Sequence, residues 1–470
     1  MLFYHKRTTK QHRKGLFSAL LLCFSITAAL FSGTAADASE TPDLYHWPTG
    51  PQISAGGAIL IEAETGAVLF EKNATETFYP ASTTKLMTTL LALENSALGE
   101  IVTASHDAVY NIEQGSSRLW VNEGEELSME ESLYAVMLPS ANDLAYAIAE
   151  HIGGSMEAFV DMMNARAKEL GCINTHFMNS YGQDEEGHYS CPADLAKIMR
   201  VLVKIPTFLK ISGSKNHQIP ATNLCAESRW VLNTHQMLRG TYAYEGVIAG
   251  KTGHNALAGN CLVTCAKRGN MTLISVILKA SDDTSLYDDT AALLNYGFNN
   301  FTTYSIGREQ LSLDTAFPPL FNREDTVQLL GNAIVNTESG CVVLPTTAAL
   351  SDTKKSVSLT QLTSFAKGKN IIGRISYTYG THTVGFANII YNNSEDSFSL
   401  DPSVSGPETV NPSGEKNKTE ENSRRDRRPL TIGIFFGCTC FFVGIYLVFV
   451  EIPYRRKRAS YLAKHKNESH

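Results

Sequence analysis

Several features that would place this chain in a specialised class are missing. The 34 glycines and 16 prolines are spread along the 470 residues without a repeat, which excludes a collagen-like protein. Charged residues make up only 19% of the chain and hydrophobic residues 43%, so the chain as a whole is not intrinsically disordered. No Cys-x-x-Cys pair occurs, and a zinc cluster or a thioredoxin-like site therefore has little support. The composition is that of a globular protein long enough for two or three domains.

Acidic residues outnumber basic residues between the two ends of the chain. The formal net charge is −7, and the acidic excess lies between a basic N-terminal leader and a basic C-terminal tail. A surface of that sign repels polyanions, so we exclude nucleic acid as a partner.

The two ends of the chain predict export and a membrane anchor. Residues 1–38 combine a basic start, an apolar run and the small residues Ala36 and Ala38, as in a cleaved signal peptide; an uncleaved anchor is the alternative. Residues 430–450 carry no charge and are long enough to span a bilayer as a helix. Basic residues follow at 455–458, which favours a cytoplasmic tail over 451–470. We therefore expect a single-pass protein of the cell membrane, with the preceding domains on the extracellular face.

Six cysteines lie in the part expected outside the cell. An even number permits disulfides, but the sequence does not choose among the many pairings, and buried free thiols are an equal alternative. These cysteines are Cys172, Cys191, Cys225, Cys261, Cys265 and Cys341.

The distribution of apolar residues predicts two folded domains. Residues 57–73 have the pattern of a β-hairpin with a Glu64-Thr65-Gly66 turn, helical periodicity follows, and strand-like runs return at 258–266 and 271–280. This order predicts an α/β (α+β) domain over 39–302 whose first and last strands pair in one sheet. Short β-rich stretches over 303–393 predict a small all-β sandwich. Residues 394–429 have almost no aliphatic side chains and predict a disordered linker.

Ser82 and Lys85 begin the first predicted helix, three residues apart and thus on one helical face. The positive end of the helix dipole favours a serine alkoxide there, and lysine can take the serine proton if the lysine is neutral. Neutrality near pH 7 requires the lysine pKa to fall by about three units, which burial and a second cation can provide. The alternative is that Ser82 only caps the helix.

Two further motifs lie at the starts of a later predicted helix and a later predicted strand. Ser140 and Asn142 precede a second helix, where a hydroxyl could pass a proton to a leaving amine and an amide could hold a substrate carbonyl; helix capping is again the alternative. Lys251, Thr252 and Gly253 start a late strand. There they could supply a cation, a hydroxyl donor and room for a peptide along the strand edge, unless they only form a surface turn. Chance rarely places all three motifs in this order at the starts of elements.

The three motifs and their surroundings resemble the low-molecular-mass penicillin-binding proteins, the serine-type D-alanyl-D-alanine carboxypeptidases. The resemblance extends from residue 53 to residue 301 and includes Tyr79-Pro80-Ala81-Ser82, Asn174-Thr175-His176-Phe177 and His188-Tyr189-Ser190. It implies a penicillin-recognising serine transpeptidase/β-lactamase-like domain and a β-sandwich that holds this domain off the membrane. It also implies a peptidoglycan stem peptide as substrate, β-lactam antibiotics as inhibitors, and neither a metal nor a cofactor.

The resemblance also implies a role for each motif residue. Ser82 would attack the carbonyl between two terminal D-alanines, with Lys85 as its base and Ser140 assisting proton transfer. The backbone N–H groups of Ser82 and His254 would form the oxyanion hole. The residues expected to bind the substrate are Asn142, Lys251, Thr252, Gly253 and His254, with Lys251 and Thr252 at its carboxylate.

One departure from the family concerns that substrate carboxylate. The family often carries an arginine between the last strand of the domain and its closing helix, but residues 281–290 read SDDTSLYDDT and contain none. Arg239 or Arg268 could replace it. Without a replacement, carboxypeptidase activity would be weak or another peptide end would be preferred.

Three other functions share these motifs. A β-lactamase would need a general base on a loop before Lys251, and no Glu-x-x-Leu-Asn pattern occurs over 182–246. A DD-endopeptidase that cuts cross-links would differ only in what occupies the leaving-group side. A non-catalytic module that binds the wall or senses β-lactams would keep the fold with an inactive site.

Overall fold

The computed structural model describes residues 45–308, 310–312, 334–359, 364–393 and 398–399. The chain divides into one unit over Met1–Asp401 and a second over Pro402–His470, and all described residues belong to the first. The predicted signal peptide, the membrane segment at 430–450 and the tail at 451–470 lie outside the described residues, as does nearly all of the predicted linker. Within the described part, no helix combines the length and apolar character needed to cross a bilayer.

A five-stranded antiparallel sheet forms the centre of the first domain. Its strand order is β2 (Val68–Lys72), β1 (Gly57–Glu62), β9 (Met271–Ala280), β8 (Gly259–Arg268) and β7 (Val247–Asn255). The predicted pairing of the first and last strands is confirmed, because β1 pairs with β9 from Gly57–Leu278 to Glu62–Leu273. The predicted hairpin is also present, with Gly66 in the left-handed region at φ +72°. Strand β7 is an edge strand, so one of its sides is open to other elements.

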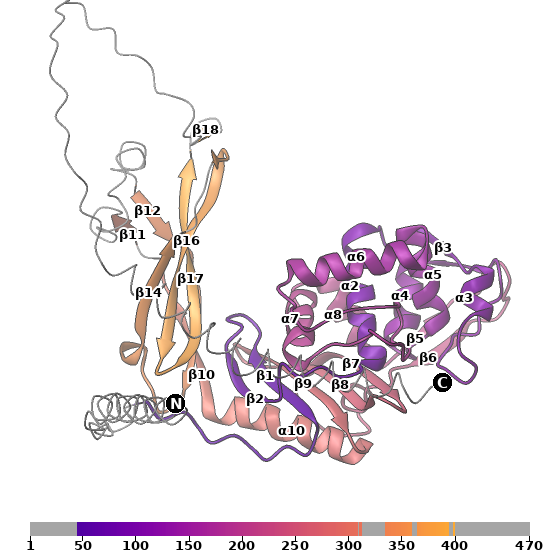
Figure 1. Ribbon diagram of the computed structural model, residues 1–470, viewed down its shortest axis with the longest axis horizontal. Helices are drawn as coiled ribbons and strands as arrows, with labels where there is room; N and C mark the ends of the chain where they lie inside the picture. The colour runs from indigo at the N-terminus through magenta and orange to yellow at the C-terminus, as the bar shows by residue number, and fades with distance from the viewer. Residues whose placement is uncertain (1–44, 309, 313–333, 360–363, 394–397, 400–470) are drawn as a thin grey trace, which may run out of the picture. The chain divides into compact units, whose positions relative to one another are not determined.

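Both faces of this sheet are covered by helices (Figure 1). Alternate side chains of β1 point to opposite sides, so Ile59 and Ile61 pack in a core with the helices of one face, and Ala58 and Leu60 pack with α10 on the other. The first face carries α2 (Lys85–Asn95), α4 (Met129–Met137), α5 (Asn142–Gly153), α6 (Met156–Glu169), α7 (Pro192–Leu202) and α8 (Pro206–Ser212). The second face carries α10 (Asp283–Asn300).

Short elements connect these helices. They are η1 (Ala81–Thr84), β3 (Ile101–Thr103), α3 (His106–Tyr110), β4 (Glu126–Ser128), β5 (Asn216–Ile219), β6 (Arg229–Leu232) and α9 (Gln236–Arg239). Strands β3 and β4 pair with each other, as do β5 and β6.

The described residues from Phe301 to Ser399 are mostly in β-strands. Seven strands form one antiparallel sheet, in which a β16–β17 hairpin turns at Gly380. The side chains of this sheet form a core of their own, which includes Val342, Leu344, Ile375 and Tyr377. The seven strands are β10 (Phe301–Ile306), β11 (Gln310–Ser312), β12 (Ile334–Thr337), β13 (Gly340–Pro345), β14 (Lys354–Leu359), β16 (Gly368–Tyr379) and β17 (His382–Asn393). The turn η2 (Leu350–Asp352) and a two-stranded sheet of β15 (Ser364–Phe365) and β18 (Phe398–Ser399) complete this part, and a sandwich of two stacked sheets stays a prediction.

Candidate active site

Ser82 lies in the 3₁₀ turn η1, directly before α2 begins at Lys85. No side chain caps either η1 or α2, so the interpretation of Ser82 as a simple helix cap is wrong. Ala81 holds the left-handed region at φ +45°, an uncommon conformation for a residue with a Cβ. The turn is packed tightly from outside, because a Cβ at Gly182 would lie 1.9 Å from the Ala81 carbonyl oxygen. The backbone of η1 is thus fixed before the helix starts.

Lys85 is fully buried and its ammonium is surrounded by three acceptors. Its Nζ lies 2.8 Å from Ser82 Oγ, 2.6 Å from Asn142 Oδ1 and 2.7 Å from the Tyr181 carbonyl oxygen. Burial is the main cause that holds the pKa of Lys85 well below its ordinary value; the nearby Lys251 lowers it further and Asp143 opposes both. A neutral amine in this position keeps two N–H donors and presents a lone pair that can accept the Ser82 proton.

The segment between α4 and α5 supplies the second motif. Ser140 adopts φ +67°, is 5% exposed, and its buried Oγ has no hydrogen-bond partner among the described residues. Asn142 is the first residue of α5, whose N-cap is Ala141 without a side-chain bond, so Ser140 does not cap this helix. A strained, buried hydroxyl without a partner is free to bond to a substrate or to a proton-transfer group.

Strand β7 supplies the third motif along its open edge. Lys251 is 1% exposed, its Nζ donates to the Thr252 carbonyl oxygen at 2.9 Å, and burial lowers its pKa to about 7. The Thr252 hydroxyl lies 2.6 Å from that of Thr234, a residue that the sequence analysis did not single out. His254 follows as an exposed residue of the same strand.

Gly253 has a close neighbour that the sequence did not indicate. A Cβ there would approach the backbone of η1 rather than open space, at 3.0 Å from the Pro80 carbonyl oxygen and 3.1 Å from the Ser82 and Thr83 nitrogens. Gly253 therefore lets β7 approach the nucleophile turn closely. The expectation that Gly253 also leaves room for a peptide along the strand edge stays a prediction.

The three motifs meet at one cavity of about 820 Å³. Ser82, Ser140 and Asn142 line it from the helical side, and β7 lines it from the sheet side. Lys85 and Lys251 lie buried behind this surface. The sheet-side lining residues of the third motif are Thr252, Gly253 and His254, so all eight predicted site residues lie at or directly behind the cavity.

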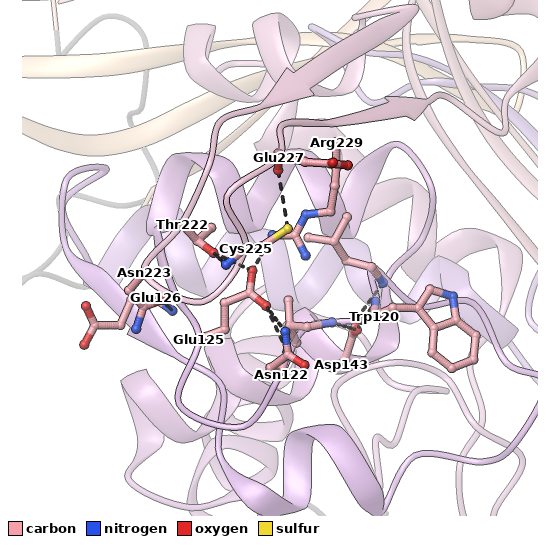
Figure 2. A network of polar contacts seen from close by, with 12 residues as sticks. Trp120, Asn122, Glu125, Glu126, Asp143, Thr222, Asn223, Cys225, Glu227 and Arg229 are labelled. Carbon is pink, nitrogen blue, oxygen red and sulfur yellow. Dashed lines mark hydrogen bonds and ion pairs between the residues drawn. The ribbon is translucent and has the colours of Figure 1, made fainter.

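A network of carboxylates fixes the helical wall of the cavity (Figure 2). Asp143 is 1% exposed and accepts the backbone N–H of Leu119 at 3.1 Å, of Trp120 at 2.9 Å and of Leu144 at 2.9 Å. Burial raises its pKa, whereas these bonds favour the ionised form, and both oxygens act as acceptors. The Ser117 carbonyl oxygen accepts the Asn142 N–H at 2.8 Å. The segment 117–120 is therefore hydrogen-bonded to both Asn142 and Asp143 at the start of α5.

Glu125 is the second carboxylate of this network. Its buried carboxylate accepts the Asn122 N–H at 2.9 Å and the Thr222 hydroxyl at 2.8 Å, and it pairs with Arg229 (Figure 2). The β5–β6 connection is thereby bonded to the turn before β4. None of these four residues lines the cavity.

Neither arginine suggested as a substitute for the family's loop arginine lines the cavity. Arg268 lies at the far end of β8, with its guanidinium 4.9 Å from the Tyr244 ring and 4.7 Å from the Phe298 ring. Arg239 is an exposed residue at the end of α9. Asp283, from the first turn of α10, lines this region instead.

Comparisons with known proteins agree with this geometry. The family model of D-alanyl-D-alanine carboxypeptidase matches residues 45–282. D-alanyl-D-alanine carboxypeptidase DacF of Bacillus subtilis is 34% identical over 321 residues, which are 67% of this chain and 75% of the relative. DacC of Escherichia coli, a D-alanyl-D-alanine carboxypeptidase by name, is 30% identical over 359 residues, 74% of this chain and 84% of the relative.

Solved structures show the same fold. Penicillin binding protein 6B from Escherichia coli is 26% identical with a TM-score of 0.54, covering 73% of this chain and 96% of that protein. The Streptomyces K15 DD-transpeptidase is 31% identical with a TM-score of 0.50, covering 54% of this chain and 100% of that protein. The family match spans half of the sequence and includes every residue that lines the cavity except Asp283, Leu286 and Tyr287. The chain therefore belongs to the D-alanyl-D-alanine carboxypeptidase family and has the α/β fold of the penicillin-binding DD-peptidases.

Proposed function

We propose that this protein is a serine D-Ala-D-Ala carboxypeptidase that removes the terminal D-alanine from peptidoglycan stem peptides through an acyl-enzyme on Ser82. The observation that carries the proposal is the 2.8 Å contact between Ser82 Oγ and a fully buried lysine amine with a strongly lowered pKa. A hydroxyl beside a neutral amine is an activated nucleophile. The family to which the chain belongs and the names of its relatives support the D-Ala-D-Ala bond as the one that is attacked.

The first chemical step acylates the serine. Neutral Lys85 takes the Ser82 proton while Oγ forms a bond to the carbonyl carbon between the two D-alanines. The backbone N–H groups of Ser82 and His254 stabilise the oxyanion, where loss of one donor costs about 3 kcal/mol. The carbon–nitrogen bond then breaks, and the D-alanine amine takes a proton that passes from Lys85 through the unpartnered Ser140 hydroxyl.

The second step releases the shortened peptide. Water attacks the ester carbonyl, loses its proton to Lys85, and the Ser82 oxygen leaves and regains a proton. Asn142 holds the substrate's amide and, by accepting from Lys85 Nζ at 2.6 Å, also holds the base in place. Thr252, with Lys251 behind it, meets the substrate carboxylate. A β-lactam would acylate the same Ser82 and occupy the site.

We also propose that the enzyme works outside the cell, tethered to its membrane. The basic and apolar leader over 1–38, the uncharged segment over 430–450 and the basic residues after it support export and a single C-terminal anchor. In this proposal a β-sandwich over 303–393 and a linker over 394–429 hold the catalytic domain away from the bilayer.

The test uses the full chain in detergent and a pentapeptide that ends in D-Ala-D-Ala. We expect release of D-alanine, complete inhibition by penicillin, and covalent penicillin on the protein but not on a Ser82→Ala variant. Absence of D-alanine release by folded, penicillin-labelled protein would refute the carboxypeptidase proposal. Rapid turnover of nitrocefin would indicate a β-lactamase instead. Wall binding by Ser82→Ala with an unchanged cellular role would indicate a non-catalytic module.

A further inference from the structure

The end of the cavity that receives the leaving group is formed by four polar side chains, and we call it the leaving-group end. Thr252 of β7 lies 2.6 Å from Thr234, hydroxyl to hydroxyl. Gln236 follows at the start of α9, and its Nε2 lies 3.3 Å from Asp283 Oδ2. All four residues line the cavity, so strand β7, the segment that enters α9 and the first turn of α10 converge on the place where the proposed function puts the terminal D-alanine.

This end has no cationic surface. Among the described residues that line the cavity there is no lysine or arginine, whereas Glu113, Asp184 and Asp283 are present. Lys251 is the nearest cation along β7, but it is 1% exposed and its Nζ donates to the Thr252 carbonyl oxygen. Burial lowers its pKa to about 7 and thereby disfavours its charged form. A free carboxylate therefore gains little attraction here and faces the negative charge of Asp283.

Hydroxyl and amide groups bind differently from a cation. The Thr234 and Thr252 hydroxyls and the Gln236 amide can each donate to an oxygen, whether that oxygen belongs to a carboxylate, an amide or a peptide bond. The Asp283 carboxylate can accept from an amide N–H but only repels a carboxylate. This set of groups fits a neutral leaving group at least as well as an anionic one.

We propose that the leaving-group end accepts a D-alanine whose carboxylate is blocked, as an amide or as a peptide bond, as readily as a free one, and that Asp283 sets this preference. The inference rests on the proposed function and narrows its substrate class. The bonds that form and break are unchanged: the Ser82 ester forms, the carbon–nitrogen bond breaks, and the leaving amine departs as D-alanine or as its amide. Only binding of the leaving group differs.

Asp283 also has a structural role that the test must separate from its role in specificity. It lies in the first turn of α10, where a negative charge interacts favourably with the helix dipole. The capping bonds at this end come from Asp282 and Ser285, not from Asp283. Asp288 is a matched control, because it is an exposed carboxylate on the same helix that bonds to the Tyr242 hydroxyl at 2.7 Å and does not line the cavity.

The experiment compares two peptides on the full chain in detergent. One is diacetyl-L-lysyl-D-alanyl-D-alanine and the other is the same peptide with a C-terminal amide; the acetyl groups remove cations that Glu113 and Asp184 could attract. We expect kcat/KM for the two peptides to agree within about threefold in the native enzyme. Asp283→Asn should raise the preference for the free acid by roughly two- to tenfold, the effect of one partly solvated charge. Asp288→Asn should leave it unchanged, and added salt should reduce the difference.

Two results would overturn the inference while the proposed function stands. One is a native enzyme that cleaves the free acid more than about thirtyfold faster than the amide, a gap of about 2 kcal/mol. The other is an equal shift by Asp283→Asn and Asp288→Asn at equal thermal stability. Cleavage of neither peptide, together with no penicillin label on Ser82, would instead refute the proposed function and this inference with it.

Discussion

The two walls of the cavity differ in how far their polar side chains are exposed to solvent. On the nucleophile wall, Lys85 is fully buried and makes three hydrogen bonds of 2.6 to 2.8 Å. On the opposite wall, Thr234 and Asp283 are exposed and bond to neighbours that also line the cavity. Chemistry needs a base without charge, and burial provides it by lowering the lysine pKa. Recognition needs groups that a substrate can reach, so the second wall stays open to water.

The largest expected effect comes from removing the base on the nucleophile wall. Lys85→Met removes the group that accepts the Ser82 proton, and we expect the rate of acylation by penicillin to fall by roughly 10⁴-fold, as when a member of a catalytic triad is lost. Ser82→Ala should abolish covalent labelling entirely. The measurement is the rate of covalent labelling by a fluorescent penicillin, with thermal denaturation to verify folding. Labelling of Lys85→Met at the native rate would show that the base is another group.

A second prediction concerns the tight packing of the same wall. In Gly182→Ala the new Cβ would lie 1.9 Å from the Ala81 carbonyl oxygen and 2.9 Å from the Ser82 nitrogen, so η1 must shift. We expect acylation to fall by about 10²-fold, because misplacement of a nucleophile by about 1 Å has that effect. The free energy of unfolding should also fall by about 3 kcal/mol, from overpacking added to backbone strain.

Gly187→Ala is the matched control for that prediction. Gly187 has the same φ of +90°, but its nearest contact to a Cβ would be Met178 Sδ at 3.5 Å. The substitution should therefore show only the cost of a left-handed alanine, about 1–2 kcal/mol in the free energy of unfolding, with acylation unchanged. Equal losses of acylation in the two variants would mean that backbone strain, not the contact with η1, controls the nucleophile.

The sequence predicted the parts of this wall that depend on side chains close together in the chain. Ser82 and Lys85 are three residues apart, so helical geometry alone places them together. The hairpin pattern over 57–73 and the strand-like run at 271–280 predicted the strands that pair. Contacts between residues far apart in the chain were not predicted. The Tyr181 carbonyl oxygen that accepts from Lys85 is a backbone atom, which any residue type would supply.

The sequence also did not indicate which neighbours the fold gives to several residues. Gly253 stands out in its motif, but a glycine does not reveal which neighbour needs its space, and here that neighbour is η1. Thr234 carried no signal because an isolated threonine in a loop is common, and only the fold brings it to Thr252. Arg268 was a reasonable substitute in sequence, yet β8 carries it to the end away from the cavity.

A third prediction tests the electrostatic link between the two walls. Lys251 lowers the pKa of Lys85, and Asp143 raises it. Lys251→Met removes the first influence, so the pKa of Lys85 rises and less of it is neutral at a given pH. We expect the acidic limb of the pH profile of kcat/KM to move to higher pH, with acylation at pH 7 falling about tenfold and recovering at alkaline pH. A uniform loss at every pH would show that Lys251 acts only in substrate binding.

The smallest effect should come from the open wall. Thr234→Val removes one hydroxyl donor from the leaving-group end and leaves Thr252 without its 2.6 Å partner. The group is solvated in the free enzyme and does not touch the nucleophile, so we expect KM for the peptide to rise about two- to fivefold with kcat nearly unchanged, the effect of one exposed hydrogen bond. Thr241→Val is the control, since the exposed Thr241 bonds only to the Gln236 carbonyl oxygen among the contacts of the described residues. A fall in kcat for Thr234→Val, with KM constant, would assign this hydroxyl to the transition state and end the distinction between a catalytic wall and a recognition wall.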